Sequence, residues 1–272
     1  MPPSGSSFTA LNLPSGFILP RCMEYFTVTA GPNTDLWRKP GGPDTATAPI
    51  VFTSLRRRFE MAEVTVTADW EMEWDQGGLV IFAGAAPQSS EDVSPIHHVP
   101  PLSSSSPPPP PPLGVSPAAT RLGTAPRPRP RPGKWVKAGM EFCSGTMNIS
   151  SVSATADGAD WCASPLEHGR PAMVHSLRIK LERVGHALWI WYQVPAVMTP
   201  GAVLDGVWRK LREVTWFFYG VEDKFVHVGV YASRPNRLSR SATMWETMNG
   251  DGMEGMGVAD GLVVEFEDLE IS

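Results

Sequence analysis

The chain has 272 residues, a formal charge of −5 and a pI near 5.7. Hydrophobic residues make up 42% and charged residues 19%, which is ordinary for a globular protein. The acidic balance, with no basic face outside one arginine-containing run, argues against a nucleic-acid partner. Neither a signal-peptide pattern after Met1 nor a membrane-spanning apolar stretch is present, so we expect a cytoplasmic or nuclear protein without membrane contact.

The three cysteines, Cys22, Cys143 and Cys162, are odd in number and have no paired motif spacing. This argues against a disulfide framework and against a structural zinc site. The histidines show no metal-ligand spacing either. We therefore expect reduced thiols, no metal and no cofactor.

Residues 86–132 hold more than half of the 28 prolines, including an unbroken run at 107–112. Proline lacks the amide donor of a sheet ladder, and the segment buries too little apolar surface to order itself, so we predict a disordered insert rich in proline and serine. Arginine and proline alternate at 126–132, which suits a polyproline II segment. The insert is either a ligand for a proline-recognition module of a protein partner or, more simply, an expanded loop.

Outside this insert, hydrophobic periodicity favours strands over helices. Residues 64–74 alternate apolar with polar side chains, the period of a half-buried strand. Many short strands and no strongly helical segment predict an all-β sandwich or barrel. Residues 1–16 are expected to be flexible and 17–272 to form one domain. We predict strands at 25–29, 64–75, 78–82, 135–143, 147–153, 176–183, 187–194, 215–219, 226–232 and 262–271.

Several motifs occur together in a fixed order: Thr-Asp-Leu-Trp-Arg-Lys at 34–39, Asp-Gln-Gly-Gly-Leu at 75–79, Trp-Val-Lys-Ala-Gly-Met-Glu at 135–141, Ser-Val at 151–152 followed by Asp-Trp at 160–161, and residues 228–235. As a set they resemble the domain of unknown function 1349 family. That family is similar to concanavalin A-like lectins and glucanases and includes the fungal regulation of enolase protein 1. The resemblance implies a two-sheet antiparallel β-sandwich, a concanavalin A-like jelly roll with one concave face. It does not imply a reaction, because one fold hosts many functions.

The polar and aromatic residues of these motifs are the candidate ligand-binding residues. An indole face stacks on the apolar face of a sugar, and carboxylate or amide groups bond its hydroxyls. No catalytic or metal-binding residue is predicted. The candidates are Asp35, Trp37, Asp75, Gln76, Trp135, Lys137, Glu141, Asp160 and Trp161.

In the predicted strand 135–143, alternate residues share one face. Trp135 there is either a stacking platform for a ligand or a core residue. Lys137 and Glu141 are either polar anchors or an ion pair with each other, and Gly139 leaves room for a ligand.

A glycosidase needs two carboxyl groups across the scissile bond. Glu71, Glu73 and Asp75 share one face of the predicted strand 64–75, but their order departs from the Glu-x-Asp-x-Glu strand of lectin-like glucanases. Glu71 and Glu73 are more simply solvent-facing residues, which leaves Asp75 with Glu141 as the pair to test. We expect no glycosidase activity.

Three functions remain open from the sequence. The first is a non-enzymatic lectin-like domain that binds a glycan or small polar ligand on the concave sheet face. The second is a cytosolic regulatory domain that binds a protein, such as a metabolic enzyme. The third is a glycoside hydrolase-like enzyme, kept because the superfamily contains many. The insert falls between two strands that both carry candidates, so we expect it beside the site.

Overall fold

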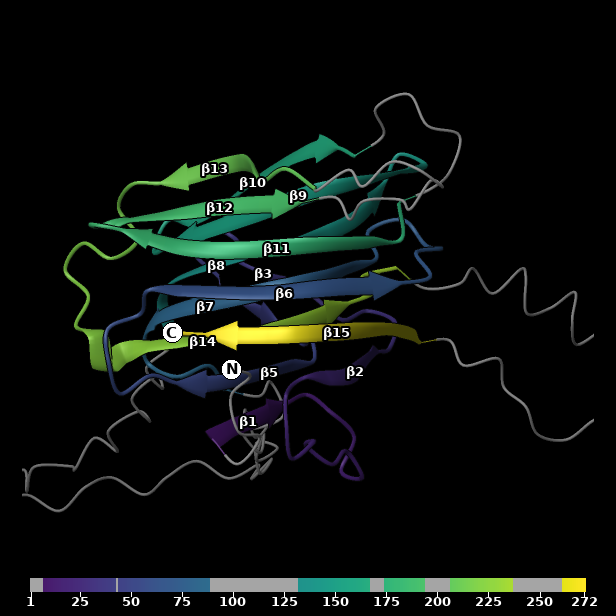
Figure 1. The fold of residues 1–272 in the computed structure, drawn as a ribbon, viewed down its shortest axis with the longest axis horizontal. Coiled ribbons are helices and arrows are strands. Elements are labelled where there is room, and N and C mark those ends of the chain that lie inside the picture. The colour runs from purple at the N-terminus through teal and green to yellow at the C-terminus, as the bar shows by residue number, and fades with distance from the viewer. Residues whose placement is uncertain (1–6, 43, 89–131, 167–173, 194–205, 237–260) are drawn as a thin grey trace, which may run out of the picture.

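The computed structural model describes residues 7–42, 44–88, 132–166, 174–193, 206–236 and 261–272 (Figure 1). Within these ranges the regular structure consists of strands and the short 3-10 helix η3 (Asp223–Phe225). The strands are β1 (Phe8–Leu11), β2 (Tyr25–Ala30), β3 (Leu36–Trp37), β4 (Thr45–Ala46), β5 (Ile50–Ser54), β6 (Met61–Ala68), β7 (Gln76–Gly84), β8 (Pro132–Cys143), β9 (Thr146–Thr155), β10 (Gly158–Pro165), β11 (Ser176–Val184), β12 (Ala187–Gln193), β13 (Arg209–Val214), β14 (Val226–Ser233) and β15 (Leu262–Ile271).

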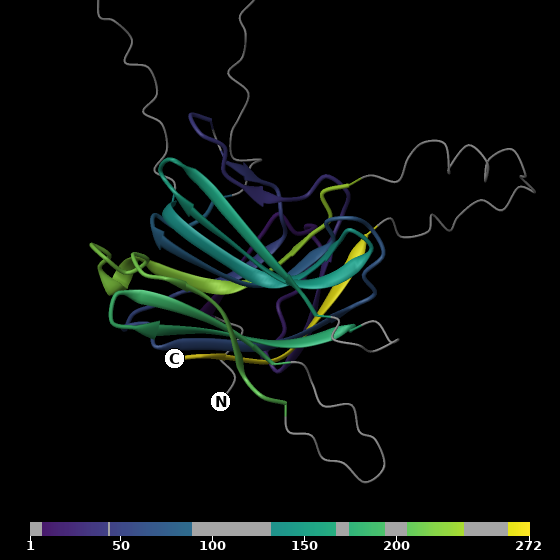
Figure 2. The same ribbon diagram turned by 90° about the horizontal axis from the view of Figure 1, so that it is seen from above.

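Two antiparallel sheets pack face to face, which confirms the predicted β-sandwich. The seven-stranded sheet has the order β1-β5-β14-β7-β8-β9-β10, and the six-stranded sheet has the order β13-β12-β11-β6-β15-β2. A small third sheet pairs β3 with β4. Figure 2 shows the two layers from above, with the β3–β4 segment on the outer, concave side of the seven-stranded sheet. No helix within the described ranges is long and apolar enough to cross a membrane.

The main core lies between the two sheets and follows from alternation along each strand. On β11, Leu177, Ile179 and Leu181 are fully buried and face the other sheet, whereas the residues between them lie on the outer face. Fully burying such a side chain contributes about 1.5–3 kcal/mol relative to leaving it exposed. The tight turn at Gly185, with φ of 63°, pairs β11 with β12 as the sequence predicts.

A second apolar cluster covers the concave face of the seven-stranded sheet. It gathers the alternate residues of β7, β8 and β14, such as Phe82, Trp135 and Tyr231, under Leu36 of β3. Arg38 fixes the β3–β4 segment to the sheet. It forms an ion pair with Asp44 and donates hydrogen bonds to the carbonyl oxygens of Gly133 on β8 and Thr155 on β9. This second cluster leaves only part of the concave face open.

The structure corrects several predicted strand boundaries. The run 215–219 is rich in aromatic residues but forms turns, and the neighbouring strand is β13. The alternation at 64–75 continues beyond β6, yet the chain turns at 69–75, so Glu71 and Glu73 do not lie on a strand. Strand β1 falls in the segment 1–16 that was expected to be flexible, and its backbone pairs with β5. It has only four residues, too short a run to show a period.

The predicted insert, 86–132, lies almost entirely outside the described residues. Its points of attachment are defined, because Gly84 at the end of β7 pairs with Pro132 at the start of β8. At the other end of the same pair of strands, Gln76 lies opposite Glu141. At about 3.3 Å per residue, the attachment points are therefore roughly 25–30 Å along the strands from Gln76 and Glu141. The insert is therefore attached at the end of these strands that lies away from Glu141, and the expectation that it lies beside the site falls on residues outside the described ranges.

Glycines on the concave face allow neighbouring backbones to approach closely. A Cβ at Gly139 would lie 2.1 Å from the Gly77 carbonyl oxygen, and a Cβ at Gly78 would lie 2.1 Å from the Ala138 carbonyl oxygen. These contacts are to backbone atoms, which cannot rotate away. Gly139 is therefore required by strand pairing, whatever space it leaves for a ligand.

We expect Gly139→Ala to lower the free energy of unfolding by about 1–3 kcal/mol, because the added methyl group forces β7 and β8 apart. Gly133→Ala is the matched control on the same strand. Its Cβ would meet nothing closer than 3.7 Å, and its effect should stay within about 0.5 kcal/mol. Urea denaturation followed by tryptophan fluorescence measures both, and equal losses would contradict this account.

Candidate functional site

Strand β8 carries the polar centre of the open part of the concave face. Its even-numbered residues, Val136 to Met140, point into the main core, so Lys137 and Glu141 point to the other side. Lys137 lies between Val80 and Val152 on the adjacent strands, and Glu141 lies next to Gln76. Alternation along one strand thus places a cation and a carboxylate on the same face.

Lys137 is almost completely buried, with 1% of its side chain exposed. Its ammonium group binds Asp35 Oδ1 at 3.0 Å and lies 5.4 Å from the centre of the Tyr231 ring. Although both residues are described, no ion pair within 4 Å joins Lys137 to Glu141. Asp35 therefore neutralises the lysine, and the alternative of a Lys137–Glu141 pair is wrong.

Glu141 is fully buried from solvent and has only neutral hydrogen-bond donors. Trp161 Nε1 donates to both carboxylate oxygens, at 3.1 and 3.2 Å. Burial raises the pKa of Glu141 above its ordinary value, and the charge of Asp35 acts in the same direction. Hydrogen bonds from Ser150 and Trp161 and the charge of Lys137 oppose this rise. The carboxylate is thus desolvated without a cation in direct contact.

Two partly exposed tryptophans lie next to Glu141. Trp74 and Trp161 are 37% and 41% exposed, and their rings meet edge to face with centroids 6.2 Å apart. Trp74 has φ of 72°, a left-handed conformation that is an outlier for a bulky residue. Such strain costs on the order of 1–3 kcal/mol and is concentrated at functional sites.

These side chains line one pocket of about 280 Å³. Its walls are largely apolar, and its polar atoms are the carboxylates, the lysine ammonium group and an amide. The residues come from β7 to β10, the 33–37 segment, the 69–75 turn and the segment just after β14. The lining residues are Asp35, Trp37, Trp74, Gln76, Lys137, Glu141, Val152, Trp161 and Pro235.

Six of the nine residues predicted from the sequence line this pocket: Asp35, Trp37, Gln76, Lys137, Glu141 and Trp161. Trp135 is fully buried in the second apolar cluster, so its indole presents no free face for stacking. Asp160 points away from the pocket and forms an ion pair with Arg212. Asp75 has no exposed surface and does not line the pocket.

Asp75 instead lies behind the pocket and fixes the positions of segments that line it. Its two oxygens accept hydrogen bonds from Arg234 Nε at 2.9 Å and Nη2 at 2.8 Å, and both side chains are buried. Asp75 Oδ2 also accepts the backbone N–H of Met72 at 3.0 Å and thereby closes the turn that holds Trp74. Since both oxygens are occupied, Asp75 is not available as a carboxyl partner for Glu141 in hydrolysis.

The sequence analysis missed Trp74, Val152 and Pro235 in the pocket and Arg234 behind it. The sequence did point to Arg234, because the 228–235 motif ends on Arg-Pro. It did not point to Trp74 as a site residue, since the alternation of residues 64–74 placed that residue on the apolar face of a predicted strand.

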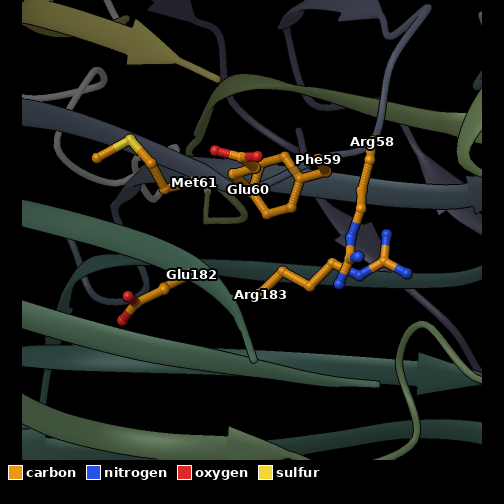
Figure 3. Close-up of a pocket in the computed structure, with 6 residues that line it drawn as sticks. All are labelled: Arg58, Phe59, Glu60, Met61, Glu182 and Arg183. Atoms are coloured by element: carbon orange, nitrogen blue, oxygen red, sulfur yellow. The ribbon is translucent and has the colours of Figure 1, made fainter. Parts of the chain in front are cut away.

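A second hollow, of about 370 Å³, lies beside the start of β6 and the end of β11 (Figure 3). No predicted site residue lines it. Arg183 there is already engaged, because it binds Asp223 at 2.6 Å and the Gly185 carbonyl oxygen at 3.1 Å. Across the part of the chain that the structure describes, no three His, Cys, Asp or Glu side chains gather as metal ligands would.

A family model described as "Protein of unknown function (DUF1349)" matches residues 21–272. The chain belongs to this family. The resemblance seen in the sequence motifs is thereby confirmed, and the match includes every residue that lines the pocket.

This DUF1349 chain is also similar to individual proteins. The uncharacterized protein AN7484 of Emericella nidulans is 28% identical over 213 residues, which cover 78% of each chain. A functionally unknown protein from Saccharomyces cerevisiae has a similar solved structure, with a TM-score of 0.56 at 18% identity, covering 99% of this chain and 98% of that one. A GH43 protein from Bacillus licheniformis reaches a TM-score of only 0.47 at 9% identity, covering 91% of this chain and 32% of that one.

We expect Arg234→Gln to lower the free energy of unfolding by about 3–5 kcal/mol, because it leaves the Asp75 carboxylate buried and unpaired. Arg212→Gln is the matched control. Its partner Asp160 is 73% exposed, so its loss should cost about 0–1 kcal/mol. Chemical denaturation of both variants gives the comparison, and a small loss for Arg234→Gln would show that the pair does not organise the turn.

Glu141→Gln should change stability in a pH-dependent way. The raised pKa means that ionisation of Glu141 costs stability as pH rises from the unfolded value, near 4.5, through the folded value. The glutamine variant avoids this cost, so its stability relative to wild type should increase over that range and remain constant at higher pH. Thermal unfolding between pH 4 and 8 measures the difference. Glu213→Gln, which alters an exposed carboxylate on β13, should not show this rise.

Proposed function

We propose that this protein is a non-enzymatic binding domain whose pocket on the concave sheet face receives a single sugar unit or a polar ligand of similar size. The observation that carries the proposal is Trp74. A bulky residue is held in a strained left-handed conformation and presents a partly exposed indole beside Trp161 and the buried Glu141. Strain of this kind persists only where the surrounding structure enforces it, and it is concentrated at functional sites.

The chemistry of the pocket supports a sugar. A sugar has an apolar face, which the indoles of Trp37, Trp74 and Trp161 can cover. Its hydroxyl groups can bond Gln76 and, when the partly exposed Trp161 shifts, the buried Glu141. The size also fits: a pocket of about 280 Å³ lies near the lower end of the range of small-molecule sites, about 300–1,000 Å³, as expected for a ligand as small as one sugar ring.

Binding is favoured over hydrolysis by the state of the nearby carboxylates. Both oxygens of Asp75 bind Arg234, and Asp35 binds Lys137 and the backbone N–H of Leu36. Glu141 is therefore the pocket carboxylate without a cationic partner, and glycoside hydrolysis by the usual route needs two.

We expect Trp161→Ala and Trp74→Gly each to weaken sugar binding about tenfold, corresponding to about 1.4 kcal/mol for one lost aromatic contact. Glycine adopts the left-handed backbone of residue 74 without strain, so a loss of binding in that variant cannot be attributed to a distorted turn. Isothermal titration calorimetry with monosaccharides and disaccharides measures the change.

Trp189→Ala is the control for these variants. Trp189 is a partly exposed tryptophan on the outer face of the six-stranded sheet, away from the pocket, so its replacement should leave sugar affinity unchanged. Absence of binding by the wild-type chain at millimolar concentrations across the sugars would refute the proposed function.

A further inference from the structure

The charges in the pocket do not balance. Three charged side chains line it, and Lys137 and Asp35 neutralise each other through their contact at 3.0 Å. Glu141 is the remaining charge, and its direct partners are the neutral donors Trp161 and Ser150. An ionised Glu141 therefore leaves the pocket with one uncompensated negative charge.

A second acceptor next to Glu141 has no donor. Gln76 lies directly opposite Glu141 in the pairing of β7 with β8, lines the pocket and is only 6% exposed. Its Oε1 atom is buried and has no hydrogen-bond partner among the described residues. Buried polar atoms in native proteins are nearly always paired, so this acceptor is suited to a donor from an ordered water or from a molecule bound in the pocket.

The aromatic walls favour the same sign of charge. The faces of indole rings carry negative electrostatic potential and attract cations within about 6 Å. Glu141 and the ring faces of the pocket tryptophans would both repel an anionic ligand. Both would attract a cationic ligand.

We propose that the pocket selects a sugar that carries a protonated amino group, such as a glucosamine unit, over a neutral sugar of the same size. Glu141 and Gln76 Oε1 expose almost no surface in the free pocket, so the neighbouring, partly exposed indoles of Trp74 and Trp161 must shift when the ligand binds. The ammonium group then supplies several N–H donors to these two acceptors, while the ring packs against the tryptophans. This inference rests on the proposed function, that the pocket binds a sugar, and adds the charge of the ligand.

Binding of the amino sugar then has two limits in pH. Glu141 must be ionised, and burial raises its pKa, so affinity falls as acid protonates it. The ligand amine must be protonated, so affinity also falls as alkali removes its proton. The charged groups that face Glu141 are Lys137 from β8 and Asp35 from the segment before β3, while Gln76, Ser150 and Trp161 contribute neutral groups from β7, β9 and β10. Two further titratable groups interact with it, Tyr231 from β14 and Cys143 from β8, and burial raises the pKa of both, which keeps them neutral at neutral pH.

The test is calorimetric titration of the full chain with glucosamine, glucose, N-acetylglucosamine and glucuronate at neutral pH and fixed salt. We expect glucosamine to bind at least about tenfold more tightly than glucose, N-acetylglucosamine to resemble glucose, and glucuronate to bind most weakly. Glu141→Gln should remove the advantage of glucosamine and the acidic limb of its pH profile, while the affinity for glucose changes less. Glu213→Gln, on the exposed strand β13, should keep the wild-type order of affinities.

Gln76→Met provides a second variant in case Glu141→Gln does not fold, as judged by circular dichroism. It removes the unpaired acceptor at similar size and should weaken glucosamine more than glucose. Equal binding of glucosamine and glucose by the wild-type chain would overturn this inference and leave the proposed function intact. Binding of none of the four sugars would overturn both.

Discussion

The ion pair between Asp75 and Arg234 holds together segments that are 159 residues apart in the chain. Both side chains are buried, and desolvating two charges is repaid only when the geometry is good and the remaining hydrogen-bonding positions are filled. Here they are filled: Asp75 closes the turn before β7, and the backbone N–H of Arg234 donates to Thr34 Oγ1 at 2.9 Å. One interaction thereby positions Trp74 on the turn and Asp35 beside Thr34. The walls of the pocket therefore depend on a contact between two residues that do not line it.

The sandwich could be predicted from the sequence because strand period is a local property. On β11, residues 177, 179 and 181 alternate with charged residues, and the structure buries this apolar set. The same reasoning failed where alternation continued into a turn. Residues 69–75 keep the strand pattern, but the carboxylate of Asp75 bonds backbone N–H groups three and four residues earlier and bends the chain. A side-chain hydrogen bond to the local backbone can turn the chain even where the two-residue alternation predicts a strand. The alternation alone does not show that such a bond forms.

The sequence predicted most of the residues that belong to the site. It could not predict which of them line the pocket and which lie behind it. The relation of Lys137 to Glu141 is local to one strand and follows from alternation. The partner of Lys137 is Asp35, 102 residues away, and which carboxylate neutralises the lysine depends on how the β3–β4 segment folds over the sheet. Trp135 shares the face of Lys137, yet that same segment covers it. Tertiary packing thus decided between the binding and core roles that the sequence left open.

The pairing of β7 with β8 separates a connection that can vary in length from the pocket residues, whose positions stay fixed. The strands are held in register from Gly84 and Pro132 at one end to Gln76 and Glu141 at the other, so a connection of any length at the first end leaves the second unchanged. The residues between these strands can therefore lengthen, shorten or change composition without moving the carboxylate and the amide at the pocket. Family members that differ widely in the length of this connection should superpose closely at the pocket, so variation there says little about ligand choice.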